Sequence, residues 1–284
     1  MNNQKIAILA DSGLDVPADF VAKHDIYVVP LKLLFGDTEY YDRVTLTPEQ
    51  AYEMIDTQYP KTSLPSAAEI TAVLDKIKSD GFEKVLGIFI SSGLSGTFNI
   101  ARICMEEYEG LECYAVDTKN IAIAAGFNAM QAAAYIEQGM PWEELKRTVE
   151  NNIGNSKVFF SLATLDYLQK GGRIGLVASV AGKMIDFKPV ISCNDDGIYY
   201  VAGKSIGRKK SLEKAKSLIQ NFGKDAVKYN LAVMYGGNVP EIEQIKADVM
   251  RMFPNPQYFT EGQISPILGV HTGPGLVGIA LQII

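Results

Sequence analysis

The stretch "FISSGLSGTFN", Phe89 to Asn99, gathers small hydroxyl side chains at a predicted bend between a strand and a helix. An apolar run from Val85 to Ile90 precedes the bend, and a helix-like pattern follows it. An α/β hydrolase places its nucleophile at such a bend, where this chain has Ser95. The same position suits a protein that holds an anion at a helix N-terminus. A plain structural role, capping of the following helix by Ser91 or Ser92, is the third reading.

Hydrolysis at Ser95 requires a general base, which is usually a histidine. The chain contains two histidines, His24 and His271. His24 closes a short polar helix pattern and is expected at the surface, so His271 is the candidate base. The fifth position of the G-x-S-x-G motif is Thr97 here instead of glycine. A serine esterase or thioesterase that uses Ser95 and His271 is therefore the alternative function.

Two further segments carry groups that bind anions. In "KTSLPS", Thr62 and Ser63 precede a predicted helix, where hydroxyl groups can donate to a carboxylate or phosphate. In "LQKGGRIG", Arg173 follows a helix stop at two glycines, and its planar guanidinium suits oxyanions. The alternatives are a simple helix start for the first segment and a solvated side chain for Arg173.

Metal and nucleotide chemistry have no support in the sequence. Histidine is scarce, and no zinc or calcium motif occurs. The segment from Gly273 to Gly278 fits G-x-G-x-x-G, but it contains a proline and precedes a predicted strand where a helix is required. We therefore expect no metal site and no cofactor.

Composition indicates a globular protein of two domains. The 284 residues are 47% apolar and 21% charged, and the net charge of −6 argues against nucleic-acid binding. The three cysteines are widely spaced and predict neither a disulfide framework nor a zinc site, which favours a reducing, cytoplasmic environment. The apolar run near the N-terminus is too short for a signal peptide or a membrane span.

Strand and helix patterns alternate through about residue 155, which predicts a mostly parallel sheet with flanking helices. "IYVVPLKLLF" reads as one strand, and Thr47 and Ser66 each begin a capping box. The second half reads as an α+β sheet with helices, and "NDDG" predicts a hairpin. We predict an N-terminal α/β domain over residues 1–160 and a C-terminal α+β domain over residues 161–284. Ligands of such parallel sheets bind at the carboxyl ends of the strands, where Ser91 to Thr97 lies.

Five blocks occur together along the chain: "ADSGLDVP", "TSLPS", "FISSGLSGT", "SLATLDYLQKGGRI" with "KPVI", and "HTGPGLVGI". In combination they resemble the DegV family, bacterial fatty-acid-binding proteins, some of which are the acyl-carrying subunit of a fatty acid kinase. The resemblance spans about residues 5 to 284. It implies two α/β domains with a long-chain fatty acid in an apolar tunnel between them.

The resemblance also implies roles for individual residues. Thr62 and Ser95 match the residues that hydrogen-bond the fatty-acid carboxylate, and Ser63, Arg173 and His271 would lie near the head group or the kinase. The resemblance also implies presentation of the acid to a fatty acid kinase; in the basic segment from Lys204 to Lys210, Ile206 stands where family members often carry arginine, which weakens the expectation of kinase docking but does not affect the pocket. The tail-lining residues are expected to be Ile123, Phe160, Ile267 and Leu268.

The resemblance favours a carrier over an enzyme. A hydroxyl that donates to a bound carboxylate needs no base, whereas hydrolysis does. We therefore expect Ser95 to hold an acid without attacking it. Phosphorylation of the bound acid would need a partner that brings ATP and Mg²⁺.

Overall fold

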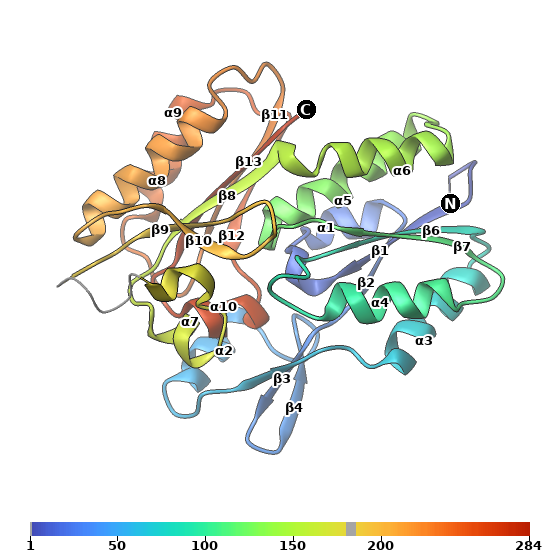
Figure 1. Ribbon diagram of the computed structural model, residues 1–284, viewed down its shortest axis with the longest axis horizontal. Helices are drawn as coiled ribbons and strands as arrows, with labels where there is room; N and C mark the ends of the chain where they lie inside the picture. The colour runs from blue at the N-terminus through green and yellow to red at the C-terminus, as the bar shows by residue number, and fades with distance from the viewer. Residues whose placement is uncertain (1, 180–185) are drawn as a thin grey trace.

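Two β-sheets lie on either side of one buried helix, α5 (Ala122–Glu137) (Figure 1). The structure is a computed structural model that describes residues 2–179 and 186–284. The four-stranded sheet, its helices and a small three-stranded sheet inserted into it are called the first lobe, and the six-stranded sheet with its helices is called the second lobe. This arrangement confirms the predicted α/β fold class.

The sheet of the first lobe is parallel throughout, in the order β2-β1-β6-β7. In β1 (Ile6–Asp11), Ile6 and Ile8 pack on the α5 side, whereas Ala7 and Leu9 pack on the opposite side. This alternation follows from the two-residue period of a strand, and burial of both faces explains why residues 6–10 are all apolar. The other elements are β2 (Ile26–Val29), β6 (Lys84–Phe89), β7 (Glu112–Asp117), α1 (Ala18–Lys23), α3 (Ala67–Ser79), α4 (Thr97–Glu106) and α6 (Trp142–Asn151).

Both predicted capping boxes are confirmed. In α2 (Pro48–Ile55), Thr47 Oγ1 accepts a hydrogen bond from the backbone of Gln50, whose side chain accepts one from the Thr47 backbone. Ser66 and Glu69 form the same reciprocal pair at the start of α3. Such pairs satisfy two backbone N–H groups that the helix cannot satisfy itself.

A small antiparallel sheet, in the order β4-β3-β5, is inserted after β2. The prediction of a single strand over "IYVVPLKLLF" is wrong, because the chain leaves the first sheet at Pro30 and enters this one. Proline has no N–H to donate to a ladder, which explains the break. The strands are β3 (Lys32–Phe35), β4 (Thr38–Tyr41) and β5 (Lys61–Ser63).

The sheet of the second lobe has the order β10-β9-β8-β13-β11-β12, with β11 and β12 parallel and the other neighbours antiparallel. Helices α8 and α9 cover one face, and α5 packs against the other. The predicted domain boundary at residue 160 stays a prediction and falls within β8. The elements are β8 (Ser156–Ser161), β9 (Val190–Cys193), β10 (Tyr199–Gly203), β11 (Tyr229–Tyr235), β12 (Tyr258–Gln263), β13 (Val277–Ile283), α8 (Arg208–Phe222) and α9 (Ile242–Met252).

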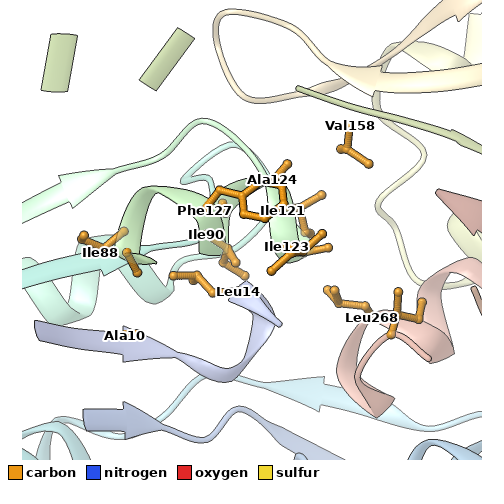
Figure 2. Packing of buried hydrophobic residues seen from close by; sticks show 14 of the residues in the cluster. Ala10, Leu14, Ile88, Ile90, Ile121, Ile123, Ala124, Phe127, Val158 and Leu268 are labelled. Carbon is orange, nitrogen blue, oxygen red and sulfur yellow. The ribbon is translucent and has the colours of Figure 1, made fainter. Parts of the chain in front are cut away.

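The apolar core is continuous across the seam between the lobes. Figure 2 shows Ile121 and Ile123, at the start of α5, between the first-lobe residue Ile90 and the second-lobe residues Val158 and Leu268. Because α5 is buried on nearly every side, its sequence is alanine-rich and apolar around its whole circumference.

Short helices complete the seam. The helix α10 (Pro266–Thr272), which the sequence patterns did not reveal, contacts α2 and α7 (Asp166–Lys170). Short 3₁₀ turns lie at η1 (Ser12–Leu14), η2 (Ile153–Asn155) and η3 (Gly175–Ser179). Among the described residues, no helix combines the length and apolar character that crossing a bilayer would require.

Candidate functional site

A cavity of about 310 Å³ lies where the carboxyl end of β6 and the strand β5 meet the second lobe. The structure brings all five predicted polar residues to its wall. Thr62, Ser63 and Ser95 come from the first lobe, whereas Arg173 and His271 come from the second. These residues are separated by up to 209 positions in the sequence, and only the packing of the two lobes joins them.

Thr62 and His271 form a hydrogen bond across the seam. The Thr62 Oγ1 atom lies 3.1 Å from the His271 Nε2 atom. Thr62 is held in place because β5 pairs with β3, with Thr62 opposite Leu33. His271 is carried by α10. The polar end of the cavity is therefore built from both lobes.

The His271 ring is neutral at pH 7 and packed against a glycine. Burial, aided by the nearby Arg173 cation, lowers the pKa of His271 to about 4. Its Nδ1 atom is buried and has no hydrogen-bond partner among the described residues. A Cβ atom at position 171 would collide with the imidazole Nδ1 and Cε1, which explains glycine at this position of "KGGRI". The neutral ring can therefore form a hydrogen bond to a bound ligand without gaining or losing a proton.

Ser95 lies just before α4, at the helix end that faces the cavity. Its Oγ lies 2.8 Å from Thr97 Oγ1 and accepts a bond of 3.3 Å from the Thr97 backbone N–H. The helix begins at Thr97, with Gly96 as the N-cap residue. The Ser95 hydroxyl is thus placed at the positive end of the helix dipole, where a carboxylate is stabilised.

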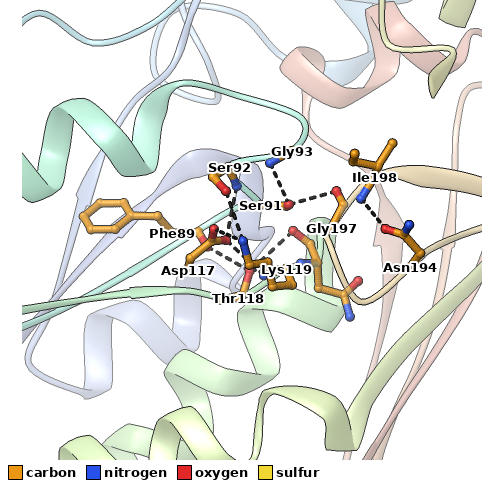
Figure 3. Close-up of polar contacts among 11 residues, drawn as sticks. Phe89, Ser91, Ser92, Gly93, Asp117, Thr118, Lys119, Asn194, Gly197 and Ile198 are labelled. Carbon is orange, nitrogen blue, oxygen red and sulfur yellow. Dashed lines mark hydrogen bonds and ion pairs between the residues drawn. The ribbon is translucent and has the colours of Figure 1, made fainter. Parts of the chain in front are cut away.

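The prediction that Ser91 or Ser92 caps this helix is wrong. The Ser91 hydroxyl donates to the Gly197 carbonyl, 2.8 Å away, in the turn between β9 and β10 (Figure 3). Ser92 donates its backbone N–H to Asp117, which also pairs with Lys119. The predicted hairpin at "NDDG" is confirmed, and Ser91 fastens it to the first lobe.

Arg173 connects the two sides of the cavity through backbone carbonyls. Its Nη1 donates to the Gly171 carbonyl at 2.7 Å, and its Nε lies 3.4 Å from the Leu94 carbonyl, next to Ser95. The guanidinium lines the cavity while it makes these contacts. It contributes positive charge to the site, and it also ties the turn of the second lobe to the loop that carries Ser95.

A narrow apolar chamber of about 30 Å³ adjoins this cavity. Ile121, Tyr199 and Leu268 line both spaces, so the chamber and the larger cavity are neighbours that share these three side chains. Of the predicted tail-lining residues, Ile123, Phe160 and Leu268 line the chamber, whereas Ile267 lines the larger cavity.

Sequence reasoning missed Tyr199, whose ring meets Phe160 edge-on with centroids 5.3 Å apart. Burial raises the pKa of the Tyr199 hydroxyl well above its usual value. As one apolar residue of a predicted strand, Tyr199 gave no sequence signal of its place in the wall. Its position depends on the hairpin that Ser91 fastens.

The profile of one protein family, described as an uncharacterised protein of the DegV family, matches residues 5–283. The chain belongs to the DegV family. A DegV domain-containing protein of Clostridium perfringens is 38% identical over 279 residues, which cover 98% of this chain and 99% of that protein. A second such protein, from Clostridium acetobutylicum, is 36% identical over 278 residues, with the same coverage of both chains.

Solved structures of DegV proteins have the same fold. A DegV family protein from Thermus thermophilus, described for its fatty acid binding, matches with a TM-score of 0.91 and 26% identity over 100% of both chains. DegV from Bacillus subtilis, a fatty acid binding protein, matches with a TM-score of 0.90 and 25% identity over 100% of both. A stearic-acid-binding protein from Eubacterium ventriosum matches with a TM-score of 0.87 and 26% identity over 98% of both.

The geometry of this DegV protein does not assemble a serine triad within the described residues. Ser95 bonds to Thr97, whereas His271 bonds to Thr62. No carboxylate orients the His271 ring, because its Nδ1 has no partner in the described part of the chain. A base without an orienting acid, and with a pKa near 4, is poorly suited to activate a hydroxyl at neutral pH. Residues 2–179 and 186–284 also hold no cluster of side chains that suits a metal ion.

Proposed function

We propose that this DegV protein binds a long-chain fatty acid without transforming it. The carboxylate lies at Thr62 and Ser95, near His271, Arg173 and Ser63, and the alkyl chain enters the apolar chamber between the lobes. The observation that carries the proposal is that a cavity lined by hydroxyl, imidazole and guanidinium groups adjoins an apolar chamber, because such a pair of spaces matches the two ends of a fatty acid. The solved fatty-acid-binding proteins of the same fold, at 25–26% identity, support it.

The polar end offers donors that compensate the loss of water from a carboxylate. Removing a carboxylate from water costs several kcal/mol unless hydrogen bonds replace the lost ones. The hydroxyls of Thr62 and Ser95, the start of α4 and the cation of Arg173 provide this compensation. The head-group contacts therefore select acids over alcohols or esters.

The alkyl chain supplies most of the affinity. Each buried methylene contributes about 0.8 kcal/mol, so about fifteen contribute on the order of 12 kcal/mol before ordering costs. The chamber is narrow, so a long chain enters it only when side chains such as Phe160 and Leu268 move apart. The shape of the widened chamber then determines which acids fit.

The bound lipid tests this function directly. Lipid extracted from the purified protein is analysed by mass spectrometry, and delipidated protein is offered oleate and palmitate in a titration. We expect about one fatty acid per chain and saturable uptake. A protein that carries no fatty acid and takes up neither acid would contradict the proposal.

Presentation of the acid to an ATP-dependent fatty acid kinase is the second part of the proposal. Lys209 and Lys210 line an open groove beside Ile206, which is 48% exposed. Arg208 is less suited to docking, because it bonds to Glu241 and to the Gly275 carbonyl. A purified bacterial fatty acid kinase with MgATP should form acyl phosphate on the loaded protein. Charge reversal at Lys209 and Lys210 should reduce that product, and the absence of any product would contradict this part alone.

A further inference from the structure

Two buried carboxylates of the first lobe accept hydrogen bonds from the start of α10 in the second lobe. Asp15 Oδ1 accepts from the backbone N–H of Ser265 at 3.1 Å, and Asp42 Oδ1 accepts from that of Ile267 at 3.0 Å. The exposed fractions of Asp15 and Asp42 are 5% and 1%. Both contacts cross the seam, and the sequence separations exceed two hundred residues.

These contacts satisfy backbone groups that α10 cannot satisfy itself. The first N–H groups of any helix have no partner within it, and a negative charge at that end is favourable. Ser265 is the N-cap residue, but its side chain makes no capping bond. The carboxylates of the other lobe therefore replace the local cap.

Arg43 extends the same set of contacts. Its Nη2 donates to Asp15 Oδ1 at 3.2 Å and to the Gln263 carbonyl at 2.9 Å. Gln263 ends β12, just before α10 begins. The segment that enters α10 is thus held by Asp15, Asp42 and Arg43, which we call the seam clamp.

The helix held by the seam clamp forms one wall of the cavity. Ile267, Leu268 and His271 of α10 all line it. A buried hydrogen bond has strict limits of distance and angle, so a small rotation of α10 would separate His271 from Thr62. The same rotation would move Leu268 away from its place between the larger cavity and the apolar chamber.

We propose that Asp15 and Asp42 are positioning residues for the ligand site, which they shape by holding α10 of the second lobe against the first. The effect on ligand dissociation described next rests on the proposed binding of a fatty acid. The seam clamp keeps the wall closed over the bound chain, so its loss shortens the time for which the acid stays bound. Neither carboxylate needs to touch the ligand.

Substitutions at Asp42 separate positioning from mere stability. Asp42→Ala removes the acceptor for Ile267, whereas Asp42→Asn is isosteric and keeps an oxygen at that position. We expect Asp42→Ala to raise the dissociation rate of a fluorescent fatty acid at least tenfold, and Asp42→Asn to stay within threefold of the unchanged protein. The control is Asp225→Ala, because the side chain of Asp225 is 89% exposed. Equal rates for Asp42→Ala and Asp42→Asn would overturn the inference, whatever their melting temperatures.

A second measurement needs no ligand. The nitrogen resonances of the His271 imidazole in the ligand-free protein report its bond to Thr62. We expect Asp42→Ala to shift them and Asp42→Asn to leave them near their original positions. If the unchanged protein binds no fatty acid, the proposed function fails while this measurement still tests the positioning.

If Asp42→Ala does not fold, Asp15→Ala and Asp15→Asn make the same comparison at Ser265. Unshifted resonances in a folded alanine variant would refute the positioning role.

Discussion

The hydroxyl of Thr62 in the first lobe lies 3.1 Å from Nε2 of His271 in the second, and this pair closes the polar end of the cavity. The pair is uncharged at neutral pH, because the pKa of His271 is lowered to about 4. A ligand carboxylate can therefore accept a hydrogen bond from the Thr62 hydroxyl without separating two opposite charges. Binding of a head group and the contact between the lobes are linked through this one bond.

Replacing Ser95 by alanine should weaken binding of a fatty acid. The loss of a hydrogen bond to a charged group costs about 1–3 kcal/mol, which corresponds to about a 5- to 150-fold higher dissociation constant. Calorimetric titration with oleate measures the change. Ser79→Ala, on the exposed surface of α3, is the matched control and should bind like the unchanged protein. An unaltered constant for Ser95→Ala would show that Ser95 does not hold the carboxylate.

A bulkier side chain at position 268 should discriminate between acids by length. Leu268 lies at the junction of the polar cavity and the apolar chamber, so Leu268→Trp fills the entrance to the chamber. We expect palmitate affinity to fall at least tenfold and octanoate affinity to change less than threefold. Val227→Trp, at a residue 91% exposed, controls for the added indole. Equal losses for both acids would indicate that the chain does not pass Leu268.

Much of the fold could be predicted, because each element is encoded locally. The continuous apolar run of β1 and the capping boxes at Thr47 and Ser66 are short-range patterns that tertiary packing did not override. The break at Pro30 also had a local signal, the missing N–H of proline, but a continuous apolar run concealed it. The helix α10 has a local start signal, Ser265 followed by Pro266, which the sequence analysis did not use; its hydrogen-bond acceptors, however, come from Asp15 and Asp42 of the other lobe, which no local pattern encodes.

The candidate site was less accessible to sequence reasoning. Thr62 and His271 were singled out separately, by a loop motif and by elimination of the other histidine. Their mutual hydrogen bond depends on how the lobes pack, which no local pattern encodes. The same holds for Ser91, whose expected helix cap was replaced by a bond to the Gly197 carbonyl.

Ser95 should not react with a fluorophosphonate. The His271 base is bonded to Thr62 and has no orienting carboxylate in the described part of the chain. We therefore expect intact-mass spectrometry to find no adduct after an hour with excess reagent at pH 7.5, while a serine esterase in the same tube is labelled completely. Rapid stoichiometric labelling of Ser95 would instead support the esterase alternative.

Gly197→Ala should loosen the β9–β10 hairpin that Ser91 fastens. Gly197 has φ of +76°, and a Cβ atom there would collide with the Ser91 hydroxyl. The matched control is Gly139→Ala, because Gly139 has φ of +80° but no atom within 4 Å of the added carbon. Both variants incur the backbone strain of about 1 kcal/mol, and only Gly197→Ala also disturbs the seam. Chemical denaturation should therefore find Gly197→Ala the less stable of the two, and equal losses would contradict the role of the Ser91 contact.

Stability should depend on pH through three buried carboxyl groups of the first lobe, two of which contact the second lobe. Burial raises the pKa of Asp11 and of Asp42 to about 7, and it also raises that of Asp15, although Arg43 opposes the change. Tyr52, which lies near Asp15, stays uncharged because burial raises its pKa further above neutrality. Between about pH 4 and pH 7 the folded state therefore binds more protons than the unfolded state, so these groups make stability fall as the pH rises.

His271 acts in the opposite direction, because its lowered pKa makes the unfolded state bind more protons between about pH 4 and pH 6.5. A single melting curve of the unchanged protein mixes the two effects. The comparison with Asp42→Asn separates them, since asparagine does not titrate. We expect the melting temperature of Asp42→Asn, relative to the unchanged protein, to increase steadily from pH 5 to pH 7.5. A difference that stays constant over this interval would mean that Asp42 does not retain a proton in the folded protein, and that the nearby Arg43 cation and the Ile267 N–H are enough to stabilise its charge.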